Sequence, residues 1–163
     1  MQEEQSSEAG ARKRALNYLS RKEHSTREVE SYLERKGYDG ETASRVTASL
    51  RSSGLLDDVR LAEIIVRDGP GRGWGAARVR QELLRRGIER DLVEDIAQPL
   101  LAVDDFELAL TWGRKKWPSC RGEQRVREAR LAGYLTRKGF SSSTIIRVLR
   151  VLGSEAVEDE PLP

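Results

Sequence analysis

The chain of 163 residues contains one cysteine, one histidine and one methionine, and aromatic residues make up only 6% of it. The single cysteine, Cys120, cannot form a disulfide within the chain, which agrees with a reducing cytoplasm. No apolar run approaches the roughly 20 residues that a membrane-spanning helix needs. The N-terminus is acidic and polar, unlike a secretory signal. These absences predict a cytoplasmic protein without a membrane partner.

Side chains suited to catalysis or metal binding are equally scarce. We interpret His24, the only histidine, as a polar loop residue before a helix cap. Cys120 has no cysteine partner, and the acidic residues stand at helix starts or at ion-pair spacing. The Gly-rich segment 69–75 lacks the Gly-Lys-Ser/Thr ending of a nucleotide P-loop and follows a helix. We therefore expect no enzyme activity, no cofactor and no metal.

The chain does contain a pattern that occurs three times: a leucine, three further residues, a glycine and a bulky apolar residue. It covers Leu33–Tyr38, Leu83–Ile88 and Leu135–Phe140, and the glycines lie 50 and then 52 residues apart. Apolar residues also recur at matching offsets before and after each glycine. A repeat of this length is typical of an array of similar units.

Each repeat is predicted to form three helices, because its apolar residues recur at a three/four spacing. Ser25 and Glu28 predict a capping box, and the repeated glycine predicts a left-handed helix end. Asp39, and Ser141 or Ser142, are expected to cap third helices. We expect first helices at 11–21, 57–67 and 104–116, a bend or end near Gln98 caused by Pro99, and helix ends at Gly54 and Gly153.

The predicted fold is therefore all-α, with three tandem three-helix repeats in an elongated, curved array. We expect neighbouring repeats to touch because the links between them are short. The predicted boundaries are an acidic N-terminal tail at 1–10, expected to be flexible, repeats at 11–56, 57–103 and 104–152, and an acidic C-terminal tail at 153–163.

The basic residues are concentrated between the two ends. The whole chain carries +2 while its two tails carry seven acids and no base, so residues 11–152 carry a net charge of +9. Such a body attracts polyanions or acidic protein surfaces. Arg-rich helices that only keep the protein in solution are an equally good explanation of the charge alone.

The Gly-rich turn and its aromatic neighbours offer further candidates. A flexible turn at 69–75 would bring Arg72 and a helix N-terminus towards an anion or a partner. Among the tryptophans, Trp74 is the most exposed candidate, although core packing remains favoured, whereas Trp112 is expected in the core and Trp117 against the last repeat. A site that stacks single-stranded nucleic acid needs aromatic residues interleaved with basic residues. In the last repeat only Trp112 and Trp117 lie near the basic residues in sequence.

The middle repeat carries an ordered string: Asp57-Asp58, Leu61-Ala62, Val66-Arg67, a Gly-rich turn and then Val79–Ile88. This string resembles the RecX regulatory protein family, whose members modulate the RecA recombinase. The resemblance extends from Ala11 to Leu152 and includes the three-repeat layout. Trp74 in the Gly-rich turn and the longer link Trp117–Gly122 depart from the family pattern, and no role is carried over to them.

The resemblance implies a non-enzymatic regulator that lies along the groove of the RecA–DNA filament. It would inhibit strand exchange and ATP hydrolysis and dampen the SOS response to DNA damage. Several weak contacts joined in one chain bind more tightly than any one of them. The expected partners are the RecA filament and, weakly, single- or double-stranded DNA, with the chain itself a monomer. The expected contact residues are Arg67, Arg72, Arg78, Arg80, Arg85, Arg86, Lys36, Lys115, Lys116, Arg137 and Lys138.

Two interpretations remain open at this point. Arg80 points to the apolar side of its helix, between Leu83 and Leu84, where a structural ion pair is favoured over a binding role. The alternative function is a helix-turn-helix DNA-binding regulator that acts without RecA. Its third helix would present Glu41, Thr42, Arg45 and Ser49, which is a poor set for reading base edges.

Overall fold

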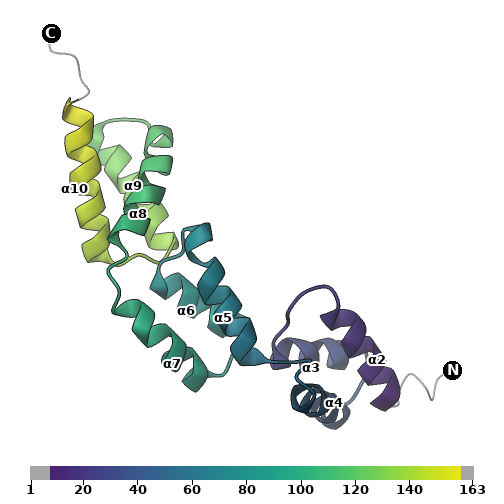
Figure 1. Ribbon diagram of the computed structural model, residues 1–163. Helices are drawn as coiled ribbons and strands as arrows, with labels where there is room; N and C mark the ends of the chain where they lie inside the picture. The colour runs from purple at the N-terminus through teal and green to yellow at the C-terminus, as the bar shows by residue number, and fades with distance from the viewer. Residues whose placement is uncertain (1–7, 159–163) are drawn as a thin grey trace. The chain divides into compact units, whose positions relative to one another are not determined.

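The computed structural model describes residues 8–158, and every regular element in that range is helical (Figure 1). This confirms the all-α prediction. No helix in the described range combines the length and apolar character needed to cross a membrane. The elements are α2 (Glu8–Leu19), α3 (Thr26–Arg35), α4 (Gly40–Ser52), α5 (Asp58–Asp68), the 3-10 turn η1 (Pro70–Arg72), α6 (Ala76–Arg85), α7 (Arg90–Leu101), α8 (Phe106–Lys116), the 3-10 turn η2 (Trp117–Ser119), α9 (Gln124–Arg137) and α10 (Ser142–Glu158).

The repeated leucine–glycine pattern ends the second helix of every repeat. In the first repeat the amide of Gly37 donates to the carbonyl of Glu34 at 2.9 Å, and the amide of Tyr38 donates to the carbonyl of Leu33 at 3.2 Å. These two bonds form a Schellman motif, in which the buried Leu33 and Tyr38 belong to one apolar cluster. Gly37 has a φ of 91°, and the same bonds recur at Gly87 (φ 77°) and Gly139 (φ 87°).

The predicted helix starts are confirmed by their side-chain caps. Ser25 Oγ accepts from the amide of Glu28 at 3.1 Å, and the Glu28 carboxylate accepts from the amide of Ser25 at 3.0 Å. This is the expected capping box before α3. Asp39 caps α4 by accepting from the amide of Thr42 at 2.8 Å. Ser141, rather than Ser142, caps α10 through the amide of Thr144.

The chain divides into two compact units that do not coincide with whole repeats. Unit 1 contains the residues up to Ile65 together with Glu82–Val93. Unit 2 contains Val66–Gln81 together with the residues from Glu94 onward. The first repeat therefore lies in unit 1 and the third in unit 2, while α5, α6 and α7 each contribute one segment to each unit.

Each unit has its own apolar core. In unit 1, α2, α3 and α4 pack on one another, and in unit 2 α8, α9 and α10 do the same. The residues at matching offsets are buried as predicted in these two repeats: Val29, Ala43, Val46 and Leu50 in the first, and Leu131, Ile145, Val148 and Leu152 in the third. In the middle repeat, Val79 and Val93 are buried at the matching offsets, whereas Ile96 and Leu100 are only half-buried.

Several predicted helix boundaries are wrong. Helix α2 already begins at Glu8, inside the predicted tail at 1–10. Helix α7 does not end near Gln98, because Pro99 lies in its last turn, where few backbone bonds remain to be lost; the alternative, a bend near Gln98, stays a prediction. Helix α10 continues past Gly153, and an ion pair between Arg114 and Glu155 at 2.6 Å supports its extra turns.

The remaining parts of the predicted layout stay predictions. Residues 1–7 and 159–163, which form most of the two predicted acidic tails, lie outside the described residues. The elongated, curved array and the repeat boundaries at 56, 103 and 152 also stay predictions. The end of α4 before Gly54 is confirmed, since α4 ends at Ser52 and Gly54 has a φ of 69°.

Candidate functional site

Four of the predicted site arginines are held in ion pairs with acidic residues of the same unit. The pairs are Arg67–Asp68 (3.1 Å), Arg80–Glu94, Arg85–Glu82 (2.5 Å) and Arg86–Glu28 (2.7 Å). The structural ion pair favoured for Arg80 is therefore confirmed. A partner would have to compete with an internal carboxylate for each of these arginines, so they are weaker binding candidates than the sequence suggested.

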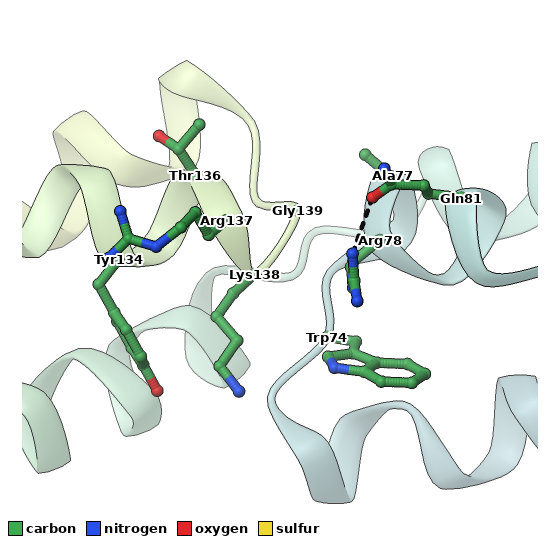
Figure 2. A pocket seen from close by; sticks show the side chains of 9 residues that line it. All are labelled: Trp74, Ala77, Arg78, Gln81, Tyr134, Thr136, Arg137, Lys138 and Gly139. Atoms are coloured by element: carbon green, nitrogen blue, oxygen red, sulfur yellow. Dashed lines mark hydrogen bonds between the residues drawn. The ribbon is translucent and has the colours of Figure 1, made fainter. Parts of the chain in front are cut away.

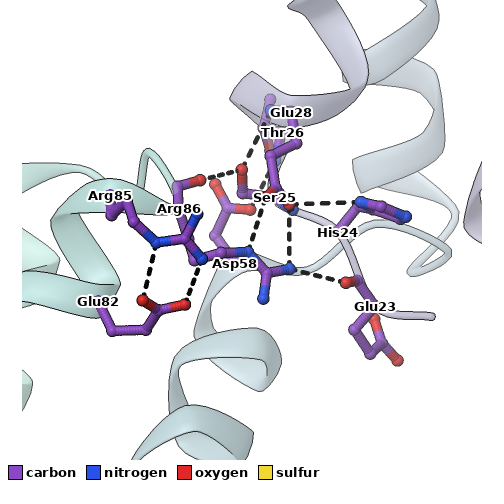
Figure 3. A network of polar contacts seen from close by, with 9 residues as sticks. All are labelled: Glu23, His24, Ser25, Thr26, Glu28, Asp58, Glu82, Arg85 and Arg86. Carbon is purple, nitrogen blue, oxygen red and sulfur yellow. Dashed lines mark hydrogen bonds and ion pairs between the residues drawn. The ribbon is translucent and has the colours of Figure 1, made fainter. Parts of the chain in front are cut away.

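Arg86 is the centre of a polar network in unit 1 (Figure 3). Its guanidinium donates to both oxygens of Glu28, at 2.7 and 3.0 Å, and to the carbonyl of Glu23 at 2.8 Å. The Ser25 hydroxyl donates to the carbonyl of Arg86. Only 13% of the Arg86 side chain is exposed. These contacts join the end of α6 to the start of α3, which is a structural role.

His24 lies at the edge of the same network. It precedes the Ser25 cap, as predicted, and it is buried, with 3% exposed. Its ring stacks on Tyr18 at 3.7 Å between centroids, and Tyr18 stacks on Tyr32 at 4.1 Å. Burial lowers the pKa of His24, although Glu28, 3.4 Å from its Nδ1, acts in the opposite direction. The folded protein thus favours neutral His24.

We expect the protein to lose stability as the pH falls below about 6.5, the ordinary pKa of histidine. The pKa of His24 is lowered in the folded state, so the unfolded state takes up the proton more readily. The stabilisation is complete above that pH and is lost as the pH falls towards the folded-state pKa. Urea midpoints at about pH 7.5 and about pH 5.5 should differ for the wild type and not for His24→Phe. An equal loss in both proteins would contradict this assignment.

A second set of predicted residues gathers around aromatic rings in unit 2. We call it the basic–aromatic surface, and it consists of Arg72, Trp74, Arg78, Trp112, Lys115, Lys116, Tyr134, Arg137 and Lys138. The Cζ atoms of Arg72 and Arg78 lie 5.0 and 5.6 Å from the Trp74 ring centroid. The Nζ of Lys138 lies 4.8 Å from the Trp112 centroid and 5.6 Å from that of Tyr134. Such distances are typical of cation–π contacts.

The lysines of α8 extend this surface. The Nζ of Lys115 lies 4.7 Å from the Trp112 ring centroid, and the Nζ of Lys116 lies 5.6 Å from that of Tyr134. Within residues 8–158, none of the cations of the basic–aromatic surface makes an ion pair with an acidic side chain. Their charge is therefore available to an external anion.

Close backbone packing holds the Gly-rich turn against the third repeat within unit 2. A Cβ on Gly73 would lie 2.4 Å from the Trp112 ring, and one on Gly75 would lie 2.6 Å from the carbonyl oxygen of Gly139. The amide of Gly75 donates to the carbonyl of Lys138 at 2.8 Å, and Lys138 Nζ donates to a carbonyl of the turn at 2.7 Å. Gly73 and Gly75 thus serve close contact, and the predicted flexibility of the turn stays a prediction.

A groove opens on the basic–aromatic surface (Figure 2). Trp74 and Arg78 line one wall, Tyr134, Arg137 and Lys138 line the other, and the volume is about 610 Å³. In Figure 2 the ammonium group of Lys138 points into the space between the rings of Tyr134 and Trp74. The groove therefore combines aromatic walls with positive charge.

The tryptophans differ in part from their predicted places. Trp112 is half-buried beneath two lysines rather than in the core, because α8 presents it to the glycine turn. Trp117 does pack against the unit 2 core, as predicted. Trp74 is half-buried. Tyr134 was missed by the sequence interpretation, although its spacing of four residues from Lys138, the residue directly after α9, was a usable signal.

Lys36 lies in unit 1, where its Nζ stands 5.7 Å from the ring centroid of Tyr32. This contact has the same spacing of four residues as that of Tyr134 and Lys138. Lys36 is exposed, but it belongs to the other compact unit and is not part of the basic–aromatic surface.

The polar residues proposed to read DNA bases in a helix-turn-helix have internal contacts. On α4, Arg45 donates to Glu41 at 2.8 Å, and Ser49 accepts from Arg12 at 2.8 Å. The Thr42 hydroxyl donates to Asp39 at 2.9 Å. In the described range, no cluster of three or more His, Cys, Asp or Glu side chains is arranged to hold a metal ion.

Comparison with known proteins provides an independent assignment. Models of the first, second and third three-helix domains of RecX match residues 11–50, 57–95 and 103–149. A regulatory protein RecX of Halorhodospira halophila is 33% identical over 94% of this chain and 96% of its own length. One from Prosthecochloris aestuarii is 33% identical over 83% of this chain and 89% of its own.

Solved structures agree with this result. A crystal structure of RecX from Lactobacillus salivarius superposes with a TM-score of 0.73 at 25% identity, over 90% of this chain and 96% of that one. A second crystal structure of a regulatory protein RecX gives a TM-score of 0.69 at 26% identity. With all three repeats matched in order, the chain belongs to the RecX family of regulatory proteins.

Proposed function

We propose that this protein regulates the RecA recombinase by binding the RecA nucleoprotein filament, along its groove, and inhibiting ATP hydrolysis and strand exchange. In the cell it would thereby moderate DNA repair and the SOS response, acting in the cytoplasm as a monomer. Membership of the RecX family supports RecA as the protein partner. Such a regulator would act by occupying the filament and would need no chemistry of its own.

The observation that carries this proposal is the set of cations on the basic–aromatic surface that no acidic residue of the described range neutralises. A filament of protein around DNA presents phosphates and acidic side chains, and both attract such a surface over roughly 10 Å at ordinary salt. The arginines already paired inside units 1 and 2 would contribute less, because binding through them means breaking an existing pair. We therefore place the main contact on Arg72, Arg78, Arg137 and Lys138, with Lys115 and Lys116 beside them.

Reversing two of these charges should weaken inhibition. The assay is RecA-dependent ATP hydrolysis on single-stranded DNA with a substoichiometric amount of this protein. We expect Arg72→Glu with Arg78→Glu to raise the concentration for half-inhibition by at least about tenfold, since repulsion replaces attraction at a charged interface. Helicity, measured by circular dichroism, should stay unchanged.

The matched control reverses two exposed arginines, Arg125 in the first turn of α9 and Arg121 just before this helix. Arg121→Glu with Arg125→Glu changes the net charge equally, yet position 125 lies about 20 Å along the helix from Lys138. This control should inhibit like the wild type. If inhibition weakened equally in both variants, the loss would come from net charge and not from the basic–aromatic surface. If the wild type did not inhibit at any ratio, the proposed function would be overturned. Tight, sequence-specific duplex binding without RecA would instead favour the helix-turn-helix regulator.

A further inference from the structure

The groove of the basic–aromatic surface has the composition of a site for an unpaired nucleotide. Proteins bind single strands by stacking bases on aromatic rings while cations track the phosphates. Trp74 and Tyr134 provide the rings from opposite walls, and Arg78, Arg137 and Lys138 provide the charges. The tertiary fold brings these residues together from two segments about sixty residues apart, within a single compact unit.

We propose that this groove binds a nucleotide of single-stranded DNA directly, with its base stacked on Trp74 and its phosphates held by Arg78, Arg137 and Lys138. This inference deepens the proposed function by naming the ligand of its contact surface. It concerns the isolated protein and does not require RecA. A duplex does not fit the same chemistry, because its bases are paired and stacked and cannot lie on the ring of Trp74.

The positions of the cations suit this ligand. The guanidinium groups of Arg72 and Arg78 lie over the Trp74 ring. A base that stacks on this ring therefore takes the place of one guanidinium group, which then lies near the phosphates that flank the base. Arg78 donates to the side-chain oxygen of Gln81 at 2.9 Å, which orients its guanidinium at the groove wall. The ammonium of Lys138 is fixed by its bond to the carbonyl of Arg72 at 2.7 Å. The charge of Lys138 is thus held in place before a ligand arrives.

The groove is also built on a rigid support. The amide of Gly75, next to Trp74, donates to the carbonyl of Lys138, so one backbone bond joins the two walls. A Cβ on Gly139 would lie 2.3 Å from the amide nitrogen of Arg78, which shows how closely the walls approach at their base. Preorganised walls lower the entropy lost when a flexible strand binds.

The test measures binding of a fluorescently labelled oligothymidylate of about 20 nucleotides by anisotropy, without RecA. We expect binding of the single strand, weaker binding of a duplex of the same length, and quenching of tryptophan fluorescence by the unlabelled strand. Trp74→Ala should lower the affinity about 5- to 150-fold, the range for one stacked base, whereas Trp74→Phe should retain most of it. Trp117→Phe, a change at the core of unit 2, is the matched control and should bind like the wild type.

A second variant tests the phosphate contacts without touching the rings. Arg137 is exposed, so Arg137→Gln should fold normally and should reduce the slope of log affinity against log salt by about 0.7, the value for one phosphate on a single strand. Three results would overturn the inference: no single-strand binding by the wild type, equal affinity for the duplex, or unchanged affinity in both Trp74→Ala and Arg137→Gln. If thymidine monophosphate bound as tightly as the oligothymidylate, the ligand would be a free nucleotide rather than a strand, and the inference would likewise be refuted.

The outcomes also separate this inference from the proposed function. A wild type that inhibits RecA-dependent ATP hydrolysis yet binds no single strand refutes the nucleotide groove and leaves the regulatory function standing. A wild type that binds the single strand without affecting RecA refutes the regulatory function and leaves the nucleotide groove standing.

Discussion

Replacing Gly139 by alanine should lower the free energy of unfolding by about 3–5 kcal/mol, the sum of a left-handed backbone penalty and a steric overlap in a packed site. Gly139 has a φ of 87°, which L-residues adopt only with strain. In addition, the new Cβ would meet the backbone nitrogen of Arg78 at 2.3 Å and its Cα at 2.9 Å. Backbone atoms cannot swing aside as a side chain can, so the two segments of unit 2 must separate.

The equivalent glycines of the other repeats are matched controls for this prediction. Gly37 has a φ of 91° but nothing within 4 Å of a new Cβ, so Gly37→Ala should cost only the backbone term of about 1–2 kcal/mol. Gly87→Ala should fall between them, because its Cβ would meet the Cδ and Cβ of Arg27 at 2.8 and 2.9 Å, which is less close than the 2.3 Å at Gly139. Urea denaturation followed by circular dichroism compares the three variants. Equal losses would show that the close approach at Gly139 costs nothing.

The Gly139 variant should also disturb the groove. Trp74, Trp112 and Trp117 are the three tryptophans of the chain and all belong to unit 2, so tryptophan fluorescence reports on this unit. We expect Gly139→Ala to change the emission of the folded protein and to weaken both RecA inhibition and single-strand binding. Gly37→Ala should leave the emission unchanged, since Gly37 lies in unit 1.

Removing the Arg86 side chain should destabilise the protein by about 3 kcal/mol, the lower end of the cost of breaking a buried ion pair. Arg86→Ala leaves the Glu28 carboxylate, which is 26% exposed, without its two guanidinium bonds. Burial alone would raise the pKa of Glu28, but the hydrogen bonds from Arg86 and Ser25 keep this pKa below its usual value. The variant loses the hydrogen bonds from Arg86 to Glu28, which lower the pKa of Glu28 more than the bond from Ser25 does. It also loses the bond from Arg86 to the carbonyl of Glu23.

Two further variants show whether the geometry of the network matters. Arg86→Lys keeps the charge but lacks the fork of the guanidinium, so we expect it to recover only part of the loss. Arg67→Ala removes a 72% exposed arginine paired with Asp68 and should change stability by less than about 0.5 kcal/mol. Urea midpoints measure all three changes. An Arg86→Ala protein as stable as Arg67→Ala would contradict the structural role assigned to Arg86.

Much of the fold could be predicted from the sequence, because it depends on interactions between residues close together in the chain. The leucine–glycine pattern predicted the helix ends because a Schellman motif needs only a glycine and two apolar residues within six positions. Ser25 with Glu28 and Asp39 predicted helix starts for the same reason, since each cap joins residues three apart. The extension of α10 past Gly153 could not be predicted, because the contact that stabilises it joins Glu155 to Arg114, 41 residues away.

The sequence by itself determined the three-helix repeats and the family, since caps, apolar spacing and turn glycines act over a few residues. Only the tertiary structure decided which of the predicted cations are available. Arg86 is neutralised by Glu28, 58 residues away. In Arg72 the backbone carbonyl accepts a bond from Lys138, 66 residues away, while the guanidinium lies over the Trp74 ring. Composition shows that arginines are abundant, but whether each one meets a carboxylate or an open groove depends on which distant segments the fold brings together.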